Sequence, residues 1–437
     1  MLSQGIASRV LDRSLRPLSK VRAGEGVSSL LMLACVFLLL TSYYVMKTAR
    51  EGMILAGGAF GLHGDELKAY TNGAMAVLLI AFVPLYGRLA NRFRRIALIN
   101  ITYAIVASCL LVFYVLNRLG VPVGIVFYVW LGIVSLLLIA QFWSYANDIH
   151  TEEQGKRLFP VIAVGGSLGA IIGPRVAGLA DTFTLLPLAA TMLVGCVALL
   201  NAVESHNGRQ PQHVIEAPIA GPGGFTLVRR DPYLLLIASM LVVLSLVNTT
   251  GEYILSNAAR EHAMAITPVI ADQREIIKSF YGNFYSTVNA LAFVVQAFVV
   301  SRLIDRFGVR RLLYVMPFVV LTAYSAIAVV GSLAVIRAAK LAENSTDYSL
   351  QNTLRQTLYL PLSRVAKYKA KAAIETFFVR MGDLLAAFLV FVGIHQLSLG
   401  RGSFAVVNIS LVAVWIAICV GLASHHRRRS HERHGDP

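Results

Sequence analysis

Long apolar runs, separated by short polar segments, fill most of this chain. Most runs are long enough to cross a bilayer, which takes about 20 residues. The pattern predicts an all-α integral membrane protein with twelve transmembrane helices. The runs cover residues 28–46, 70–87, 96–117, 121–146, 158–180, 183–203, 233–255, 280–303, 311–335, 345–361, 373–396 and 403–423.

The run at 345–361 is the weakest, because Ser, Gln, Asn, Thr and Arg side chains crowd it. We keep it as a helix because a polar helix is stable where it lines a water-filled cavity. An internal repeat also requires this helix, as the counterpart of the fourth helix in the first half. The sequence Arg88–Phe93 (RLANRF) returns at Arg302–Phe307 (RLIDRF), and Tyr43–Glu51 (YYVMKTARE) is echoed at Tyr253–Glu261 (YILSNAARE). The repeat predicts two six-helix bundles, 28–203 and 233–423.

Polar segments flank and connect these bundles. The predicted segments are a cytoplasmic N-terminal segment 1–27, a linker 204–232 rich in Pro and Gly, and a basic tail 424–437. The linker composition is typical of a flexible connector. We expect the tail to be disordered and to act as an electrostatic tether or topology signal rather than a metal site, despite its four histidines.

Composition agrees with a membrane location. The chain is 57% hydrophobic and 14% charged, against roughly 45–50% and a quarter in soluble domains. The net charge of +16 lies in short clusters between apolar runs, which favours the positive-inside rule over nucleic-acid binding. These clusters predict that both termini lie in the cytoplasm, and no cleavable signal is apparent.

Small residues inside the runs favour helix packing over chemistry. The four cysteines lie in apolar runs and are interpreted as packing residues, not as a disulfide or metal framework. Gly165, Gly169 and Gly173 fall at four-residue spacing on one helix face. No strand precedes them, so we expect close helix packing rather than a phosphate loop. No catalytic constellation is found, and we expect neither an enzyme, a cofactor nor a metal. A channel is disfavoured because no repeated pore segment is found.

Charged side chains within the runs or at the ends of their helices carry the functional argument. An ionised group at mid-bilayer costs roughly 3 kcal/mol or more, so these groups should face a polar interior. They are Arg50, Glu51, Arg175, Glu252, Arg355, Arg380 and Asp383. With Lys47 and Lys371 near the edges, cations are in surplus, which suits an anionic substrate because Arg and Lys bind phosphates and carboxylates.

Some of these groups have a purely structural interpretation. Arg380 and Asp383, three residues apart on one helix, can satisfy each other. Arg50 and Glu252 are better candidates because they occupy corresponding places in the first helix of each half, and such helices commonly line the substrate site. Glu252 can carry a coupled proton or form a gate or structural ion pair; both interpretations stay open. The predicted substrate-binding set is Lys47, Arg50, Glu51, Arg175, Glu252, Arg355 and Arg380.

The repeated RLxN/DRF motif resembles the loop signature of the major facilitator superfamily, roughly Gly-x-Leu-Ala-Asp-Arg-x-Gly-Arg-Arg. Longer stretches resemble the nucleotide transporter family of ATP/ADP translocases of plastids and intracellular bacteria, and most of all its short bacterial relatives. The stretches are YYVMKTARE (43–51), FWSYANDIHTEEQGKRLF (142–159), VNTTGEYI (247–254), FYGNFYSTV (280–288) and YSLQNTLRQTLYLPLSRVAKYKAKAAIETFF (348–378). The chain departs from that family at Lys47–Glu51, where the family reads roughly Arg-x-x-Lys-Asp, and at Tyr145–Asp148, where it reads Phe-Ala-Asn-Gln.

The resemblance implies a twelve-helix carrier that exchanges nucleotides by alternating access. Loop charges then form a predicted cytoplasmic gate: Arg88, Asn91, Arg92, Asp148, Glu153, Arg302, Asp305, Arg306 and Lys371. We expect a monomer in the lipid bilayer of a bacterial inner membrane, with a small anionic substrate such as a nucleotide and no nucleic-acid partner. The alternatives are a facilitator of an unrelated small solute and a non-transporting membrane scaffold or sensor.

Overall fold

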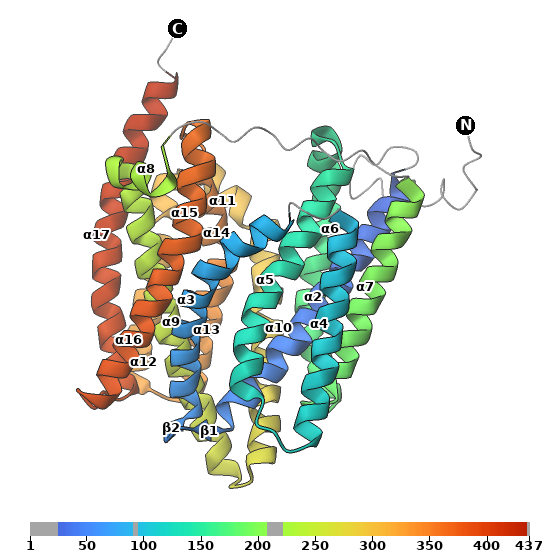
Figure 1. The fold of residues 1–437 in the computed structure, drawn as a ribbon. Helices are drawn as coiled ribbons and strands as arrows, with labels where there is room; N and C mark the ends of the chain where they lie inside the picture. Colours follow the sequence, from blue (N-terminus) through green and yellow to red (C-terminus); the bar gives the residue numbers. More distant parts are fainter. Residues whose placement is uncertain (1–24, 91–94, 208–221, 435–437) are drawn as a thin grey trace. The chain divides into compact units, whose positions relative to one another are not determined.

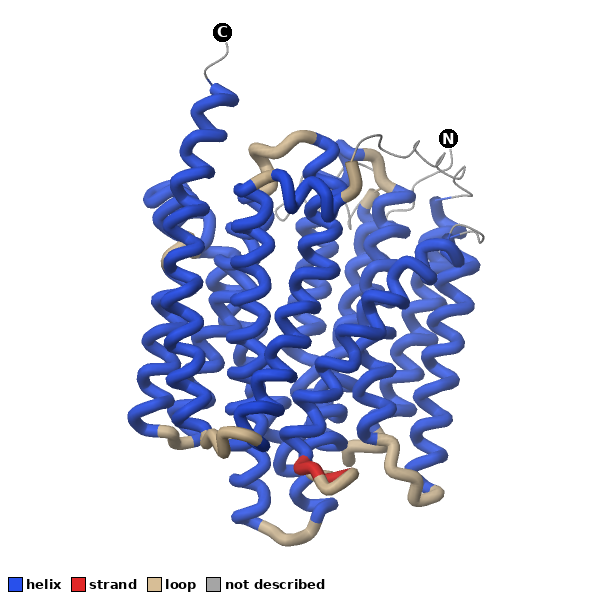
Figure 2. The backbone as a smooth tube through the Cα atoms, turned by 60° about the vertical axis from the view of Figure 1, so that its left-hand side comes forward, coloured by secondary structure: helices blue, strands red, loops and turns tan. Residues whose placement is uncertain are grey.

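The computed structural model describes residues 25–90, 95–207 and 222–434. Within these ranges the fold is almost entirely helical (Figure 2). One short antiparallel pair, β1 (Gly58–Ala59) and β2 (Leu62–His63), forms a hairpin between the first two long helices. Phe60 and Gly61 have positive φ there, as a tight hairpin turn requires.

Long helices follow one another with short connections (Figure 1). They are α2 (Gly26–Leu55), α3 (Gly64–Ala90), α4 (Arg95–Arg118), α5 (Gly124–Ile149), α6 (Glu152–Val176), α7 (Leu185–Asn207), α9 (Pro232–Ile266), α10 (Ile270–Phe298), α12 (Val315–Val330), α13 (Leu333–Thr346), α16 (Val379–His395) and α17 (Arg401–His434). Shorter ones are η1 (Ala177–Leu179), α8 (Gly224–Arg230), α11 (Val300–Leu312), η2 (Asp347–Gln351), α14 (Asn352–Leu358), η3 (Ala366–Ala370), α15 (Lys371–Ala373) and η4 (Ile374–Phe378).

Many of these helices suit a bilayer. In the described part of the chain, eight are long and apolar enough to cross a membrane, or nine if α10 and α11, bent by 75°, make one span. α12 is apolar but shorter. The predicted helical, membrane-embedded class is therefore confirmed, and the predicted number of twelve spans stays a prediction.

Several predicted boundaries were wrong. The helix predicted at 345–361 begins earlier, at Leu333, and ends at Leu358. It is formed by α13, η2 and α14, which follow one another without a break. The run before it ends at Val330, because Gly331 adopts a left-handed conformation with φ of 61°. The tail expected to be disordered continues α17 as far as His434. Of the predicted linker and N-terminal segment, residues 208–221 and 1–24 lie outside the described residues, and α8 was not predicted.

The chain forms two compact units. Unit 1 consists of Met1–Met53, Pro84–Glu216 and Arg274–Ser286, and unit 2 of Ile54–Val83, Ala217–Gln273 and Thr287–Pro437. Unit 1 thus contains a middle part of α10, and unit 2 contains most of α3. The predicted division into bundles 28–203 and 233–423 remains a prediction.

Glycines set the packing of unit 1. A Cβ atom at Gly165, Gly169 or Gly173 of α6 would lie 2.4–2.7 Å from a backbone carbonyl oxygen of α2. The two backbones therefore meet directly, as the four-residue glycine spacing predicted. α4 packs against α5 and α7 in the same unit (Figure 1).

In unit 2, α9 is the central helix. It packs against α13, α16 and α17, and α12 lies against α13 and α17. Because α9 is surrounded, polar side chains on it are shielded from lipid and must find partners on its neighbours. This arrangement positions the charged residues described next.

Candidate functional site

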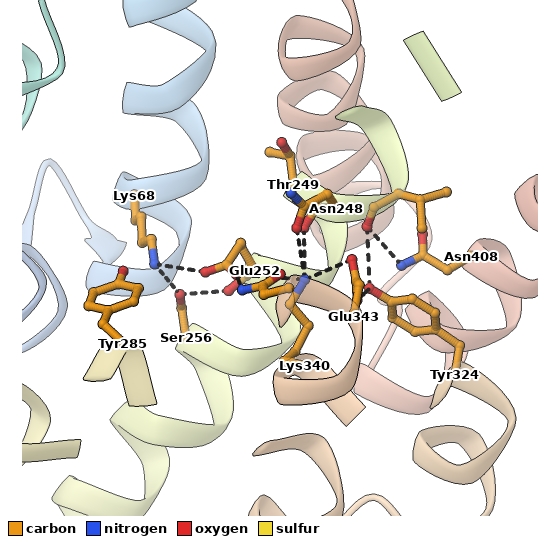
Figure 3. Close-up of polar contacts among 12 residues, drawn as sticks. Lys68, Asn248, Thr249, Glu252, Ser256, Tyr285, Tyr324, Lys340, Glu343 and Asn408 are labelled. Atoms are coloured by element: carbon orange, nitrogen blue, oxygen red, sulfur yellow. Dashed lines mark hydrogen bonds and ion pairs between the residues drawn. The ribbon is translucent and has the colours of Figure 1, made fainter. Parts of the chain in front are cut away.

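Unit 2 holds a connected set of buried charges, here called the Glu252 cluster: Lys68, Glu252, Tyr324, Lys340 and Glu343 (Figure 3). They come from α3, α9, α12 and α13. Cations and carboxylates alternate along the set, so each charge has an opposite neighbour. Buried charges are tolerated only when they are paired in this way.

Lys340 is the most enclosed member, with a fully buried side chain. Its Nζ lies 2.9 Å from Oε1 of Glu343 and 3.6 Å from Oε1 of Glu252. It also donates to the side-chain oxygen of Asn248 at 2.9 Å. Tyr324 donates its hydroxyl to the second oxygen of Glu343 at 2.9 Å, which completes the pairing on that side (Figure 3).

Lys68 approaches Glu252 from α3. Its Nζ lies 3.7 Å from Oε2 of Glu252 and donates to Ser256 at 2.8 Å. Glu252 therefore lies between two lysines of two different helices (Figure 3), and Asn344 donates to it at 3.2 Å. Its side chain is 21% exposed, whereas Lys68 and Lys340 are almost completely buried. Glu252 is the member that solvent or a solute reaches.

Unit 1 holds a second set, here called the Arg50 cluster: Lys47, Arg50, Glu51, Tyr128 and Tyr285. Arg50 and Glu51 are adjacent on α2, with Nη2 of Arg50 3.0 Å from Oε1 of Glu51. Glu51 is fully buried, and its Oε1 accepts a hydrogen bond from the hydroxyl of Tyr285 at 3.1 Å. The predicted charges at the end of the first long helix do lie together in the interior of a unit.

Aromatic rings hold the cations of the Arg50 cluster. The guanidinium of Arg50 lies 4.0 Å from the ring centre of Tyr128, and Nζ of Lys47 lies 4.2 Å from that of Tyr285. Cation–π contact stabilises a charge without neutralising it. The cluster thus holds two cations and one carboxylate, which pairs with Arg50, and Nε of Arg50 has no hydrogen-bond partner among the described residues. This surplus can bind an added anion.

Arg175 lies in the same unit at the end of α6. It is exposed and donates from Nε to the hydroxyl of Ser286 at 2.9 Å, and Ser286 donates to the carbonyl of Ile171. No carboxylate contacts Arg175 within the described part of unit 1, so its positive charge adds to the cation surplus of that unit.

The other predicted substrate residues have local partners. Arg380 pairs with Asp383 at 2.9 Å, and Asp383 also accepts from Ser245 and Thr249; the structural interpretation of this pair fits the geometry. Arg355 donates to Asn352 at 2.8 Å and lies 3.9 Å from a carboxylate oxygen of Glu375.

The predicted gate is described only in part. Asp148 accepts from Nε of Arg95 at 2.8 Å, across the ends of α5 and α4. Lys371 donates to Gln356 at 2.6 Å, Arg302 of α11 donates to the carbonyl of Phe298 at the end of α10, and Arg306 lies over the ring of Phe307. Asp305 and Glu153 are exposed. Asn91 and Arg92 lie outside the described residues, and of Arg88 only the helical backbone is described.

Sequence reasoning missed Lys68, Lys340, Glu343 and Tyr285. The first three fall just before the apolar runs at 70–87 and 345–361, outside the segments searched for buried charges. A signal for two of them was present, because Lys340, Glu343 and Asp347 recur at helical spacing among apolar residues. Tyr285 carries no such signal, since a tyrosine in an apolar run is usually a packing residue.

Comparisons with known proteins agree with this fold. The model of the Major Facilitator Superfamily matches residues 69–341, more than half of the chain. The chain is 22% identical over 337 residues to ADP,ATP carrier protein 1 of Chlamydia pneumoniae, covering 64% of this chain and 63% of that protein. With the protein of the same name from Chlamydia trachomatis serovar D it shares 24% over 293 residues, covering 57% and 54%. The matches span less than two thirds of the length of these relatives.

Solved structures show the same architecture. The nucleoside transporter NupG superimposes with a TM-score of 0.61 at 13% identity, covering 91% of this chain and 98% of that chain. A bacterial homologue of the iron transporter ferroportin, in an inward-facing state, gives 0.63 at 13% identity, with the same coverage. This level of identity establishes the fold alone. The protein is an integral membrane protein with a transporter fold, and the chain belongs to the Major Facilitator Superfamily.

Proposed function

We propose that this protein is a secondary transporter that exchanges nucleotides, or a related anionic solute, by alternating access. We place it as a monomer in the bacterial inner membrane, with twelve spans in two bundles and both termini cytoplasmic. The observation that carries the proposal is the cation surplus of the Arg50 cluster, where Arg50 pairs with Glu51, the one carboxylate of the cluster, while Lys47 lies over the ring of Tyr285.

The physical argument starts from the burial of that cluster. A buried cation attracts an anion more strongly than an exposed one, because little water screens it. The guanidinium of Arg50 is also planar, and its N–H donors match the oxygens of a phosphate or carboxylate. The similarity to ADP,ATP carrier proteins supports a nucleotide as that anion. Arg175 is the third cation of unit 1 in the proposed site.

The Glu252 cluster takes a different role in the proposal. The oxygens of Glu252 already lie near Lys68 and Lys340, so the cluster is balanced without a substrate. Such a set of carboxylates and lysines can exchange partners, or accept a proton on Glu252, as the carrier changes state. We therefore propose that it couples binding to the conformational change, with the predicted gate residues, Asp148 and Lys371 among them, closing the cytoplasmic side.

A second candidate is a facilitator of an unrelated small solute. The observation that favours it is that a nucleoside transporter and an iron-transporter homologue share this fold equally well, and the fold does not fix the substrate.

Uptake into proteoliposomes separates the two candidates. The purified full chain is reconstituted, the vesicles are loaded with ATP, phosphate or buffer, and uptake of labelled ADP is measured with and without a pH gradient. We expect uptake only into ATP-loaded vesicles, and much weaker uptake by Arg50→Ala at ADP concentrations below the wild-type KM. Equal uptake into loaded and empty vesicles would refute exchange, and no nucleotide uptake under any condition would refute the substrate class.

A further inference from the structure

A groove runs between α12 and α13 in unit 2, and no residue of the Glu252 cluster lines it. It encloses about 750 Å³, and its lining is apolar except at one end. Val315, Phe318, Val319 and Thr322 line it on α12, with Ala338 and Ala342 on the α13 side. Volumes of this size are typical of ligand sites.

The walls of the groove follow from helix periodicity. On α12 the lining residues recur at spacings of three and four, which places them on one face. The opposite wall is made of Val335 and three alanines of α13, whose small side chains leave space between the helices. The hydroxyl of Thr322 is bound to the carbonyl of Phe318 at 2.9 Å, so it offers no free polar group to an occupant.

One end of the groove is basic. Arg311 and Tyr314 line it there, just before α12 begins, and Arg310 is adjacent. Arg310 and Arg311 are both exposed, and neither forms an ion pair with another described residue. Arg311 can therefore bind an anion, and its guanidinium presents donors that suit a phosphate.

The dimensions fit one leaflet. From Tyr314 to Ala326 the groove follows α12 for about 18 Å at the helical rise of 1.5 Å per residue, and half of the hydrocarbon core is about 15 Å. The face is open to the membrane, since Phe318 is 55% exposed. A lipid chain lying along α12 would thus end at the level of the arginines.

We propose that this groove is a binding site for an anionic phospholipid, with one acyl chain between α12 and α13 and the phosphate at Arg311. The charge at one end and the apolar length behind it match the two parts of such a lipid, and basic pockets between transmembrane helices bind anionic headgroups. The site is independent of the transported substrate.

Native mass spectrometry of the full chain in detergent tests this site, with phosphatidylglycerol and phosphatidylcholine of the same acyl chains as probes. We expect retention of phosphatidylglycerol over phosphatidylcholine by about fivefold, the effect of one basic residue near a membrane surface. Arg311→Ala should remove this preference but retain phosphatidylcholine binding. Ala338→Leu should weaken binding of both lipids by filling the groove; Ala342→Leu serves if that variant does not fold. Arg230→Ala, an exposed arginine outside the groove, should behave like wild type.

Three results would overturn the proposal. The first is equal binding of the two lipids by the wild-type chain, which would leave an apolar site without headgroup recognition. The second is an unchanged preference in Arg311→Ala, or its loss in Arg230→Ala as well. The third is a doubling of mass that filling the groove abolishes, which would assign the face to a second copy of the chain.

Discussion

The two charge clusters stabilise their buried charges in different ways. In the Glu252 cluster, lysines and carboxylates alternate, and each charge has an opposite neighbour within 3.7 Å. In the Arg50 cluster, the one carboxylate pairs with Arg50, and both Arg50 and Lys47 lie over tyrosine rings. The positive and negative charges of the first cluster balance, whereas the second has a surplus positive charge that can attract an anion.

This difference indicates a division of labour. A balanced set gains little from an added anion, because the anion must displace a carboxylate that is already in place. A cation on an aromatic ring keeps its charge and its free hydrogen-bond donors. We therefore expect substitutions in the Arg50 cluster to change substrate affinity, and those in the Glu252 cluster to change stability and turnover.

The largest effect is expected from Lys340→Met. It leaves Glu343 and Glu252 without their nearest buried cation, and breaking a buried pair from one side costs about 3–5 kcal/mol. The thermal unfolding midpoint of the purified protein in detergent should fall strongly. The double variant Lys340→Met/Glu343→Gln should recover much of the loss, because it also removes one unpaired charge. Equal losses in the single and double variants would contradict the proposed pairing.

A smaller loss is expected where α6 meets α2, the helix that carries Arg50. In Gly169→Ala the new methyl group would lie 2.5 Å from the carbonyl oxygen of Phe37, and overpacking of this kind costs about 1–3 kcal/mol. Unfolding midpoint and ADP exchange should fall together. Gly178→Ala is the matched control, since its added atom meets nothing within 4 Å; a similar loss in the control would rule out a packing cause.

The smallest effect is expected from Asp148→Asn. The Arg95–Asp148 pair is partly exposed, with side chains 42% and 33% accessible, and such pairs contribute less than about 1 kcal/mol. The unfolding midpoint should stay nearly constant, and any change should appear in the exchange rate, where a gate acts. A large drop in stability would show that this pair is structural instead.

The sequence allowed the membrane class, the glycine packing and half of the buried charges to be predicted. Arg50, Glu51 and Glu252 were found because a charge inside a long apolar run stands out and needs a partner. The glycines were interpreted correctly because their four-residue spacing has one direct physical meaning. Both signals are local, so one chain is sufficient to detect them.

The partners of those charges were not predictable in the same way. Lys340 and Glu343 lie in a helix whose polar residues lower its hydropathy, and the helix is stable because α9 and α12 supply partners. Lys68 was not predicted because α3 begins at Gly64, before the apolar run at 70–87. In each case tertiary contacts outweigh local composition, and these contacts are absent from a hydropathy pattern.

Kinetics of ADP exchange in ATP-loaded proteoliposomes test the division of labour most directly, with Arg50→Ala and Glu252→Gln compared side by side. The account predicts that Arg50→Ala raises KM by about tenfold or more, the effect of losing a charge-assisted hydrogen bond. It predicts that Glu252→Gln lowers kcat by at least about tenfold while KM stays within about twofold, as a residue acting after binding should. A rise in KM for Glu252→Gln, with KM unchanged in Arg50→Ala, would contradict it.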